Sequence, residues 1–184
     1  EQLIEERTLC KNQLHAEESG AWPNAGSIKR INQRIKLLNK QMTEIDEEIK
    51  SIVEKNDWLK KKLEYVCSIK GIALISAVII VAETNGFNLV RNKKQLVSYA
   101  GLDVVEKESG ISVKGKTRIS RKGNKYLRKA LHFPALVAIR HNEQMKAVYS
   151  RLVGKHGIKM KAVVAVQKKM LELVYVLWKK EEMF

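Results

Sequence analysis

Residues 28–52 read IKRINQRIKLLNKQMTEIDEEIKSI, and this stretch decides the fold of the N-terminal part of the chain. Its apolar residues are separated by alternating steps of three and four: Ile28, Ile31, Ile35, Leu38, Met42, Ile45, Ile49 and Ile52. This spacing forms one apolar seam, as at the a and d positions of a coiled coil. Leu59, Leu63 and Val66 resume the seam after Asn56. We therefore predict one continuous helix from Ile28 to Val66, about 58 Å long at 1.5 Å per residue.

A seam of this length requires a partner helix. The preceding segment has three apolar residues on one helical face: Leu3, Cys10 and Leu14. Residues 19–27 contain two glycines and a proline and predict a turn, so the expected unit is a long antiparallel coiled-coil hairpin. The longer second helix is expected to pair further with upstream sequence or with a second protomer, with Asn56 fixing the register. A simple spacer remains the alternative.

Charge divides the chain into two domains. Residues 1–66 have 12 Lys and Arg against 12 Asp and Glu, whereas residues 67–184 have 23 against 8. The whole chain of 184 residues has a net charge of +15. A basic excess of this kind indicates a polyanionic partner, first DNA or RNA and second an anionic membrane surface. The membrane surface is disfavoured because no aromatic amphipathic face accompanies the cations, and the apolar run 72–82 is too short to span a bilayer.

The second domain, residues 67–184, is expected to be small, basic and mostly helical, so the fold class is mainly α. We expect a turn and an apolar helix over 68–83, a short helix over 93–100 and an extended basic loop or hairpin over 101–123. A helix over 125–141, interrupted near Pro134, and an amphipathic helix over 162–177 complete the domain. Because the chain begins at Glu1 within a helical pattern, we also expect a longer protein with an upstream portion.

Metal and disulfide chemistry are not expected from these residues. The two cysteines, Cys10 and Cys67, form no CxxC pair, and the four histidines share no ligand spacing. Cysteine usage fits a reducing, cytoplasmic setting.

The strongest candidate site is a cluster of cations around the end of the basic loop. Eight lie within sixteen residues: Lys114, Lys116, Arg118, Arg121, Lys122, Lys125, Arg128 and Lys129. Asn124 is a suitable N-cap for the helix that begins at Lys125. Cations and free N–H groups at a helix start favour a phosphate ligand, whereas without a ligand the same cations destabilise the helix. The alternative is a solvated basic loop.

Two glycines are candidates for backbone contacts with phosphate. Gly71 lies in Ser68-Ile-Lys-Gly-Ile-Ala, which has the look of a helix-hairpin-helix element, although Ala73 replaces its usual second glycine. Gly123 directly precedes Asn124. An ordinary glycine turn is the alternative at Gly71.

The pair Ser109-Gly110 supplies a candidate nucleophile. A serine hydroxyl attacks phosphorus only after losing its proton and with the new charge neutralised, so nearby guanidinium groups are required. Ser112 and Ser120 are competing candidates in the same loop.

These motifs together resemble the C-terminal transposase domain of the IS-one-ten family of insertion-sequence transposases, relatives of the pilin-gene invertases. The likeness runs over residues 68–177, through the Ile-Lys-Gly-Ile turn, Gln95–Leu102, Ser109-Gly110, Ile119–Asn124 and Leu127-Arg128. The coiled coil before this region also matches the family's linker.

The resemblance implies a bacterial, nucleoid-associated recombinase in which a serine of this domain, here Ser109, attacks DNA. It also implies a structured guide RNA, an upstream RuvC-like domain whose acidic residues bind Mg²⁺, and phosphate contacts from Arg118, Arg121, Lys122 and Arg128. A fragment without that upstream domain is expected to be inactive. The alternative function is a non-catalytic coiled-coil module that binds DNA or RNA.

Overall fold

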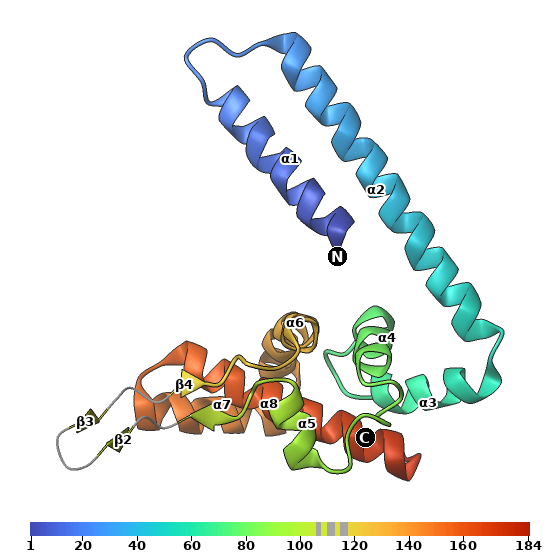
Figure 1. The fold of residues 1–184 in the computed structure, drawn as a ribbon, viewed down its shortest axis with the longest axis vertical. Coiled ribbons are helices and arrows are strands. Elements are labelled where there is room, and N and C mark those ends of the chain that lie inside the picture. The colour runs from blue at the N-terminus through green and yellow to red at the C-terminus, as the bar shows by residue number, and fades with distance from the viewer. Residues whose placement is uncertain (106–107, 110–112, 115–117) are drawn as a thin grey trace. The chain divides into compact units, whose positions relative to one another are not determined.

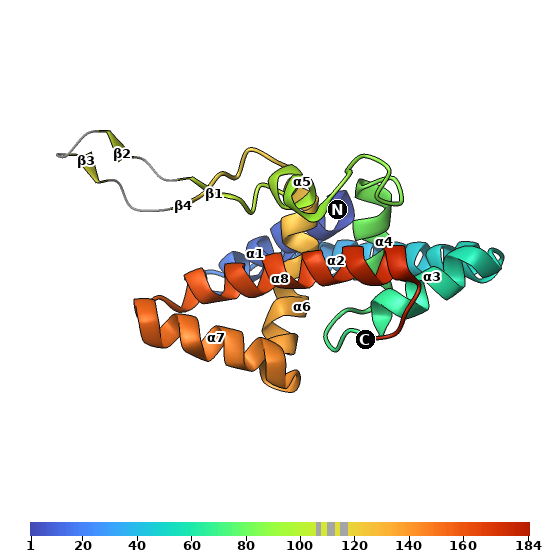
Figure 2. The same ribbon diagram turned by 90° about the horizontal axis from the view of Figure 1, so that it is seen from below.

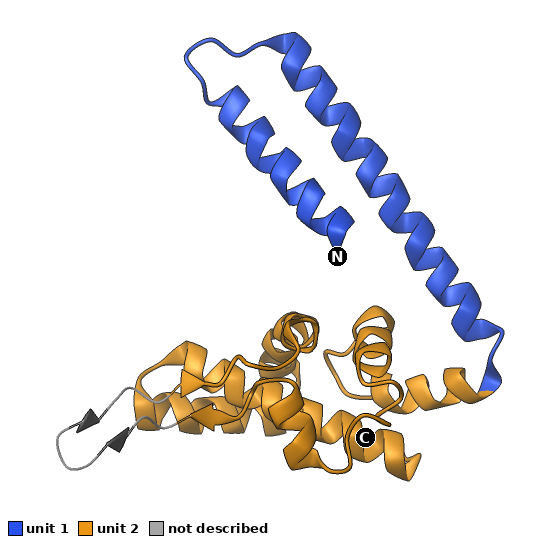
Figure 3. Ribbon diagram, in the orientation of Figure 1, with its two compact units in different colours: residues 1–57 blue, residues 58–184 orange. Residues whose placement is uncertain are grey.

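The computed structural model describes residues 1–105, 108–109, 113–114 and 118–184, and side chains outside 106–117. These residues form two compact units, 1–57 and 58–184, which are coloured separately in Figure 3. Both units are built mainly from helices, so the predicted fold class is confirmed. Among the described helices, none is both long and apolar enough to cross a membrane.

The first unit is a helical hairpin of α1 (Gln2–Glu18) and α2 (Ala25–Glu54), as predicted (Figure 1). The turn is closed by Asn24, whose side-chain oxygen accepts a hydrogen bond from the backbone N–H of Ser27 at 3.0 Å. The backbone N–H of Asn24 donates to the Glu17 carboxylate, also at 3.0 Å. Cys10 of α1 and Leu38 of α2 are buried on the expected seam. Seam and cap therefore specify this hairpin together.

The seam of α2 continues beyond the length that α1 covers. Figure 1 shows α1 beside the first part of α2, while the later part of α2 has no helix of the same unit alongside it. Ile45 and Ile52 lie in this later part and keep 44% and 63% of their surface exposed. Within residues 1–57, all of which the structure describes, the seam is therefore open at Ile45 and Ile52.

The predicted continuous helix through Asn56 is wrong. The helix α2 ends at Glu54, and α3 (Asp57–Cys67) starts as a separate helix in the second unit. Asn56 stands directly before α3, where asparagine is favoured as an N-cap, and Asp57 adds an acid to the first turn. The helix α3 ends at Cys67, one residue beyond the domain boundary predicted after Val66.

The second unit contains five further helices, which pack against one another: α4 (Leu74–Glu83), α5 (Lys93–Tyr99), α6 (Lys125–His141), α7 (Glu143–His156) and α8 (Lys159–Lys180). Helix α8 runs through the unit against α5, α6 and α7 (Figure 2). Its apolar face, including Val166, Met170 and Val174, is completely buried. The turn and apolar helix predicted over 68–83 and the helices predicted over 93–100 and 162–177 are thus confirmed.

A β-hairpin interrupts the helices between α5 and α6. The strands β1 (Val104–Val105) and β4 (Arg118–Ile119) pair antiparallel, and so do β2 (Glu108–Ser109) and β3 (Val113–Lys114). Figure 2 shows β2 and β3 farther from the helices than β1 and β4. The extended hairpin expected over 101–123 is confirmed where the chain is described.

Two features of the helices differ from expectation. Helix α6 continues without interruption through Pro134, which is buried. Helix α7 was not predicted, although both of its ends have sequence signals. Asn142 caps its start by accepting from the N–H of Met145 at 3.2 Å, and Gly157 ends it with φ +68°.

The turn between α3 and α4 packs directly against α6. Gly71 has φ +108°, and a Cβ atom there would lie 2.6 Å from the Pro134 carbonyl oxygen and 3.1 Å from the Ala138 nitrogen. Gly71 therefore serves close backbone packing, and its contact with phosphate stays a prediction.

We predict that Gly71→Ala destabilises the second unit by about 2 kcal/mol or more, since it adds both a strained φ and a backbone clash. The matched control is Gly154→Ala in α7, where a Cβ atom meets nothing within 4 Å. This control should stabilise the helix by about 0.5–1 kcal/mol. Urea unfolding followed by the fluorescence of buried Trp178 measures both changes. Equal stability of the two variants would contradict the packing role of Gly71.

Candidate nucleic-acid interface

The two ends of the hairpin are brought together by a contact between glycines. Gly101 has φ +66°, and a Cβ atom there would lie 2.7 Å from the nitrogen of Gly123. A Cβ atom on Gly123 would in turn overlap the Tyr99 carbonyl oxygen and the Gly101 nitrogen. Only glycine fits at either position, because backbone meets backbone there. The phosphate contact expected of Gly123 stays a prediction.

Hydrogen bonds from Ser120 to Asp103 and from Arg121 to Gly101 fix the base of the hairpin. The backbone N–H of Ser120 donates to the Asp103 carbonyl at 2.9 Å, and the Ser120 hydroxyl donates to the Asp103 carboxylate at 2.5 Å. The N–H of Arg121 donates to the Gly101 carbonyl at 3.1 Å. The hydroxyl of Ser120 thus already has a carboxylate partner in the fold.

Asn124 caps α6, as predicted. Its side-chain oxygen accepts from the N–H groups of Tyr126 at 2.8 Å and Leu127 at 3.2 Å. Its amide group donates to the Glu83 carboxylate at 2.5 Å, which ties the start of α6 to the end of α4. The cap therefore uses N–H groups that would otherwise be open to an anion.

Arg128 stabilises the same turn from within α6. Its Nη1 donates to the carbonyl oxygens of Ala100 at 2.8 Å, Gly123 at 3.0 Å and Asn124 at 3.3 Å. The guanidinium is half-buried, and its positive charge satisfies backbone acceptors at the hairpin base. This structural role was not foreseen, and the expected phosphate contact of Arg128 stays a prediction.

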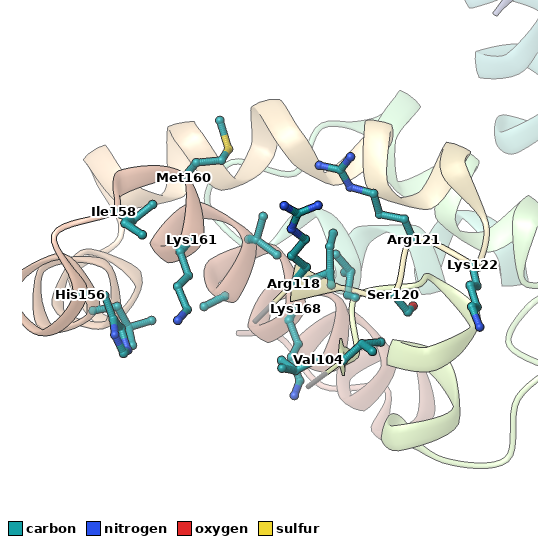
Figure 4. Close-up of a pocket in the computed structure, with 16 residues that line it drawn as sticks. Val104, Arg118, Ser120, Arg121, Lys122, His156, Ile158, Met160, Lys161 and Lys168 are labelled. Atoms are coloured by element: carbon teal, nitrogen blue, oxygen red, sulfur yellow. The ribbon is translucent and has the colours of Figure 1, made fainter. Parts of the chain in front are cut away.

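A groove of about 1140 Å³ lies between the base of the hairpin and the α7–α8 corner (Figure 4). Five of its lining residues are Lys or Arg: Arg118, Arg121, Lys122, Lys161 and Lys168. No acidic residue belongs to the described lining, so nothing in it offsets these charges. The arrangement attracts anions and concentrates the predicted cations Arg118, Arg121 and Lys122 in one place.

The structure describes only parts of the remaining predicted site residues. Ser109 and Lys114 lie in β2 and β3, and Ser109 pairs with Val113 across the hairpin. Their side chains, and all of Lys116, lie outside the described residues. Lys125 is exposed in the first turn of α6, with its Nζ 5.0 Å from the ring centroid of Tyr126.

Three groove residues were missed in the sequence: His156, Lys161 and Lys168. Lys161 and Lys168 are seven residues apart in α8, so the helical period places them on one face, and this spacing was a readable signal. The pKa of the His156 imidazole lies below its ordinary value, because desolvation and the charges of Lys161 and Lys155 disfavour its protonated form. The lowered pKa is a second sign of concentrated positive charge.

The described residues contain no group of three or more His, Cys, Asp or Glu side chains that could hold a metal ion. The Asp103 carboxylate accepts a hydrogen bond from the Ser120 hydroxyl, and the Glu83 carboxylate accepts one from the Asn124 amide. Burial, with a smaller contribution from Glu64, raises the pKa of the Cys67 thiol and makes it a weak nucleophile. The chemistry that this part of the chain offers is therefore anion binding by cations beside serine hydroxyls.

Comparison with known proteins indicates a family for this region of the chain. Residues 63–150 match the model of the IS116/IS110/IS902 transposase family. This region extends from the end of α3 into α7 and contains the whole hairpin.

Two pilin gene-inverting proteins are similar to nearly the whole chain. The protein of Moraxella lacunata is 25% identical over 178 residues, and that of Moraxella bovis is 25% identical over 175 residues. Each alignment covers 94% of this chain but 54% of the relative, so the chain spans about half the length of these relatives. The matched region and the relatives support the family that the motifs indicated, since the domain at residues 63–150 matches the IS116/IS110/IS902 family of transposases.

Proposed function

We propose that this chain is the nucleic-acid-handling half of a DNA recombinase. The observation that carries the proposal is the groove at the hairpin base, where five Lys and Arg side chains gather without a described acid. Such a surface binds phosphates through charge, and counterion release makes the binding strongly dependent on salt. The family match supports DNA as the substrate class.

In the complete recombinase, Ser109 is the proposed nucleophile. Its oxygen would attack a DNA phosphorus, the bond to one sugar oxygen would break, and the freed strand end would take up a proton. Arg118 and Arg121 would offset the charge that develops on the phosphate oxygens. The position of Ser109 next to the end of a strand, with the hairpin fixed at its base, supports this role.

Two further components of the proposal lie outside this chain. The first is an upstream RuvC-like domain that binds Mg²⁺, a metal that would activate the attacking group. The described residues hold no suitable cluster, so none of the steps assigned to this chain depends on the metal. The second is a structured guide RNA, which the family resemblance implies.

A competing serine has a specific observation in its favour. The hydroxyl of Ser120 lies 2.5 Å from the Asp103 carboxylate, which could accept its proton, and Ser120 lines the groove. A non-catalytic DNA- or RNA-binding module is the second candidate function, since the same cations would serve it equally.

We predict that the complete protein, with its upstream domain, Mg²⁺ and guide RNA, forms a DNA adduct that survives denaturation and is absent in Ser109→Ala. Gel analysis of labelled DNA measures the adduct. Ser112→Ala is the control and should retain it. Loss of the adduct in Ser120→Ala alone would transfer the role to Ser120, and DNA binding without any adduct in an active preparation would exclude serine attack.

Nucleic-acid binding should depend on the hairpin base. For Arg118→Ala with Arg121→Ala, we expect weaker binding of a DNA duplex and a salt slope smaller by about 2, since two phosphate contacts are lost. Fluorescence anisotropy at several salt concentrations measures both quantities. The control, Lys146→Ala with Arg151→Ala on exposed positions of α7, removes the same charge outside the groove. If both pairs of substitutions lowered the DNA affinity and the salt slope equally, the DNA-binding surface would not be centred on the hairpin base.

We also propose self-association through the open seam of α2. Ile45→Asp with Ile52→Asp should shift the chain toward monomer, because charges would replace exposed apolar residues of the seam. Leu37→Asp is the control, since Leu37 is exposed on the same helix but lies off the seam. Sedimentation velocity measures the change. A strictly monomeric unmutated chain at high concentration would exclude this association.

A further inference from the structure

The α7–α8 side of the groove extends the basic surface beyond the hairpin. Lys161 and Lys168 project from one face of α8, and His156 comes from the end of α7 (Figure 4). These residues face the hairpin residue Arg118 across the groove lining. They belong to α7 and α8, which pack against each other and against α6 in the core of the unit.

The same groove also contains apolar side chains that remain open to solvent. Val104, Ile158 and Met160 keep 56%, 57% and 59% of their surface exposed. Exposed apolar side chains gathered in one place usually mark a binding surface. The groove therefore combines two chemistries, positive charge and open apolar surface.

This combination distinguishes between forms of nucleic acid. A duplex stacks its bases inside and presents phosphates outside, so it gives apolar side chains at a groove wall little to contact. An unpaired strand exposes the flat faces of its bases together with its phosphates, and proteins bind such strands by stacking or apolar contact beside a cationic track. Ile and Met side chains also insert between unstacked bases in other proteins.

We infer that the groove between the hairpin base and α7–α8 binds unpaired nucleotides of a nucleic acid strand. Lys161, Lys168 and Arg118 contact the phosphates, and Ile158 and Met160 contact the faces of the bases. This inference rests on the proposed function, which makes the domain a nucleic-acid binder, and adds the form of the ligand.

The state of His156 agrees with this assignment. Its imidazole faces Lys155 and Lys161 on its own corner, and Arg118, Lys122 and Lys168 line the same groove. The lowered pKa keeps the ring neutral near pH 7, and a neutral ring can stack on a base. A bound phosphate would oppose the lysine charges and should raise the pKa of His156 toward its ordinary value.

The test compares two charge-reversal pairs on the same helix of the full chain. Lys161→Glu with Lys168→Glu changes the groove, and Lys159→Glu with Lys169→Glu changes exposed positions of α8 that do not line it. The ligands are a fluorescent single-stranded oligonucleotide and a duplex of the same sequence. We expect the groove pair to weaken single-strand binding about tenfold more than the control pair, with a smaller difference on the duplex.

A second pair of variants tests the apolar contact. Ile158→Ser with Met160→Ser should weaken single-strand binding about fivefold without changing the salt slope, because no phosphate contact is lost. Leu89→Ser, which removes an equally exposed apolar side chain outside the groove, should leave binding unchanged. Circular dichroism confirms that each variant is folded. The His156 ring signals in NMR should report a raised pKa when the single strand is bound.

The outcomes separate this inference from the proposed function. Equal effects of the groove and control pairs, or equal effects of the groove pair on single strand and duplex, would overturn the inference while nucleic-acid binding stands. Failure of the unmutated chain to bind either ligand would overturn both.

Discussion

The close approach of Gly101 and Gly123 is the constraint on which the site depends. Because backbone meets backbone at this point, both ends of the hairpin leave the helices together. Arg128 then reaches carbonyl oxygens on both sides of the junction, at Ala100 and Gly123. The hydrogen bonds from Ser120 to Asp103 hold the two strands together next to their first residue pair, Val104 and Ile119. A larger residue at either glycine would separate the strands and disperse the cations that the junction brings together.

The concentration of positive charge opposes the stability of the domain. Cations before the first turn of α6 interact unfavourably with its helix dipole. At the end of α7, the pKa of His156 is lowered first by desolvation and then by the positive charges of Lys161 and Lys155. The buried face of α8 and the cap at Asn124 hold the fold against this repulsion. A bound polyanion would reduce the repulsion among these cations, whereas without one the packing of the core must offset it. Such a concentration of like charge is typical of a binding surface.

Local patterns predicted those parts of the fold that local chemistry determines. The seam and the turn around Asn24 gave the first hairpin, and Asn124 was recognisable as a cap because its preference depends on the adjacent N–H groups. The break at Asn56 was missed because apolar spacing continues through it, although asparagine is a residue type favoured directly before a helix. The groove could not be predicted, since it joins hairpin residues to residues of α7 and α8 that lie far along the chain. The packing roles of Gly71 and Arg128 likewise depend on contacts with residues distant in sequence, Pro134 and Ala100.

The apolar seam of α2 and the basic groove lie in different units of the chain, and each is formed by contacts within its own unit. On the proposed function, this separation would allow the association of protomers and the binding of strands to be adjusted independently. On the same proposal, the groove would hold a nucleic acid strand near the base of the hairpin. The contact between Gly101 and Gly123, together with α8, would then set the position of the attacked phosphate.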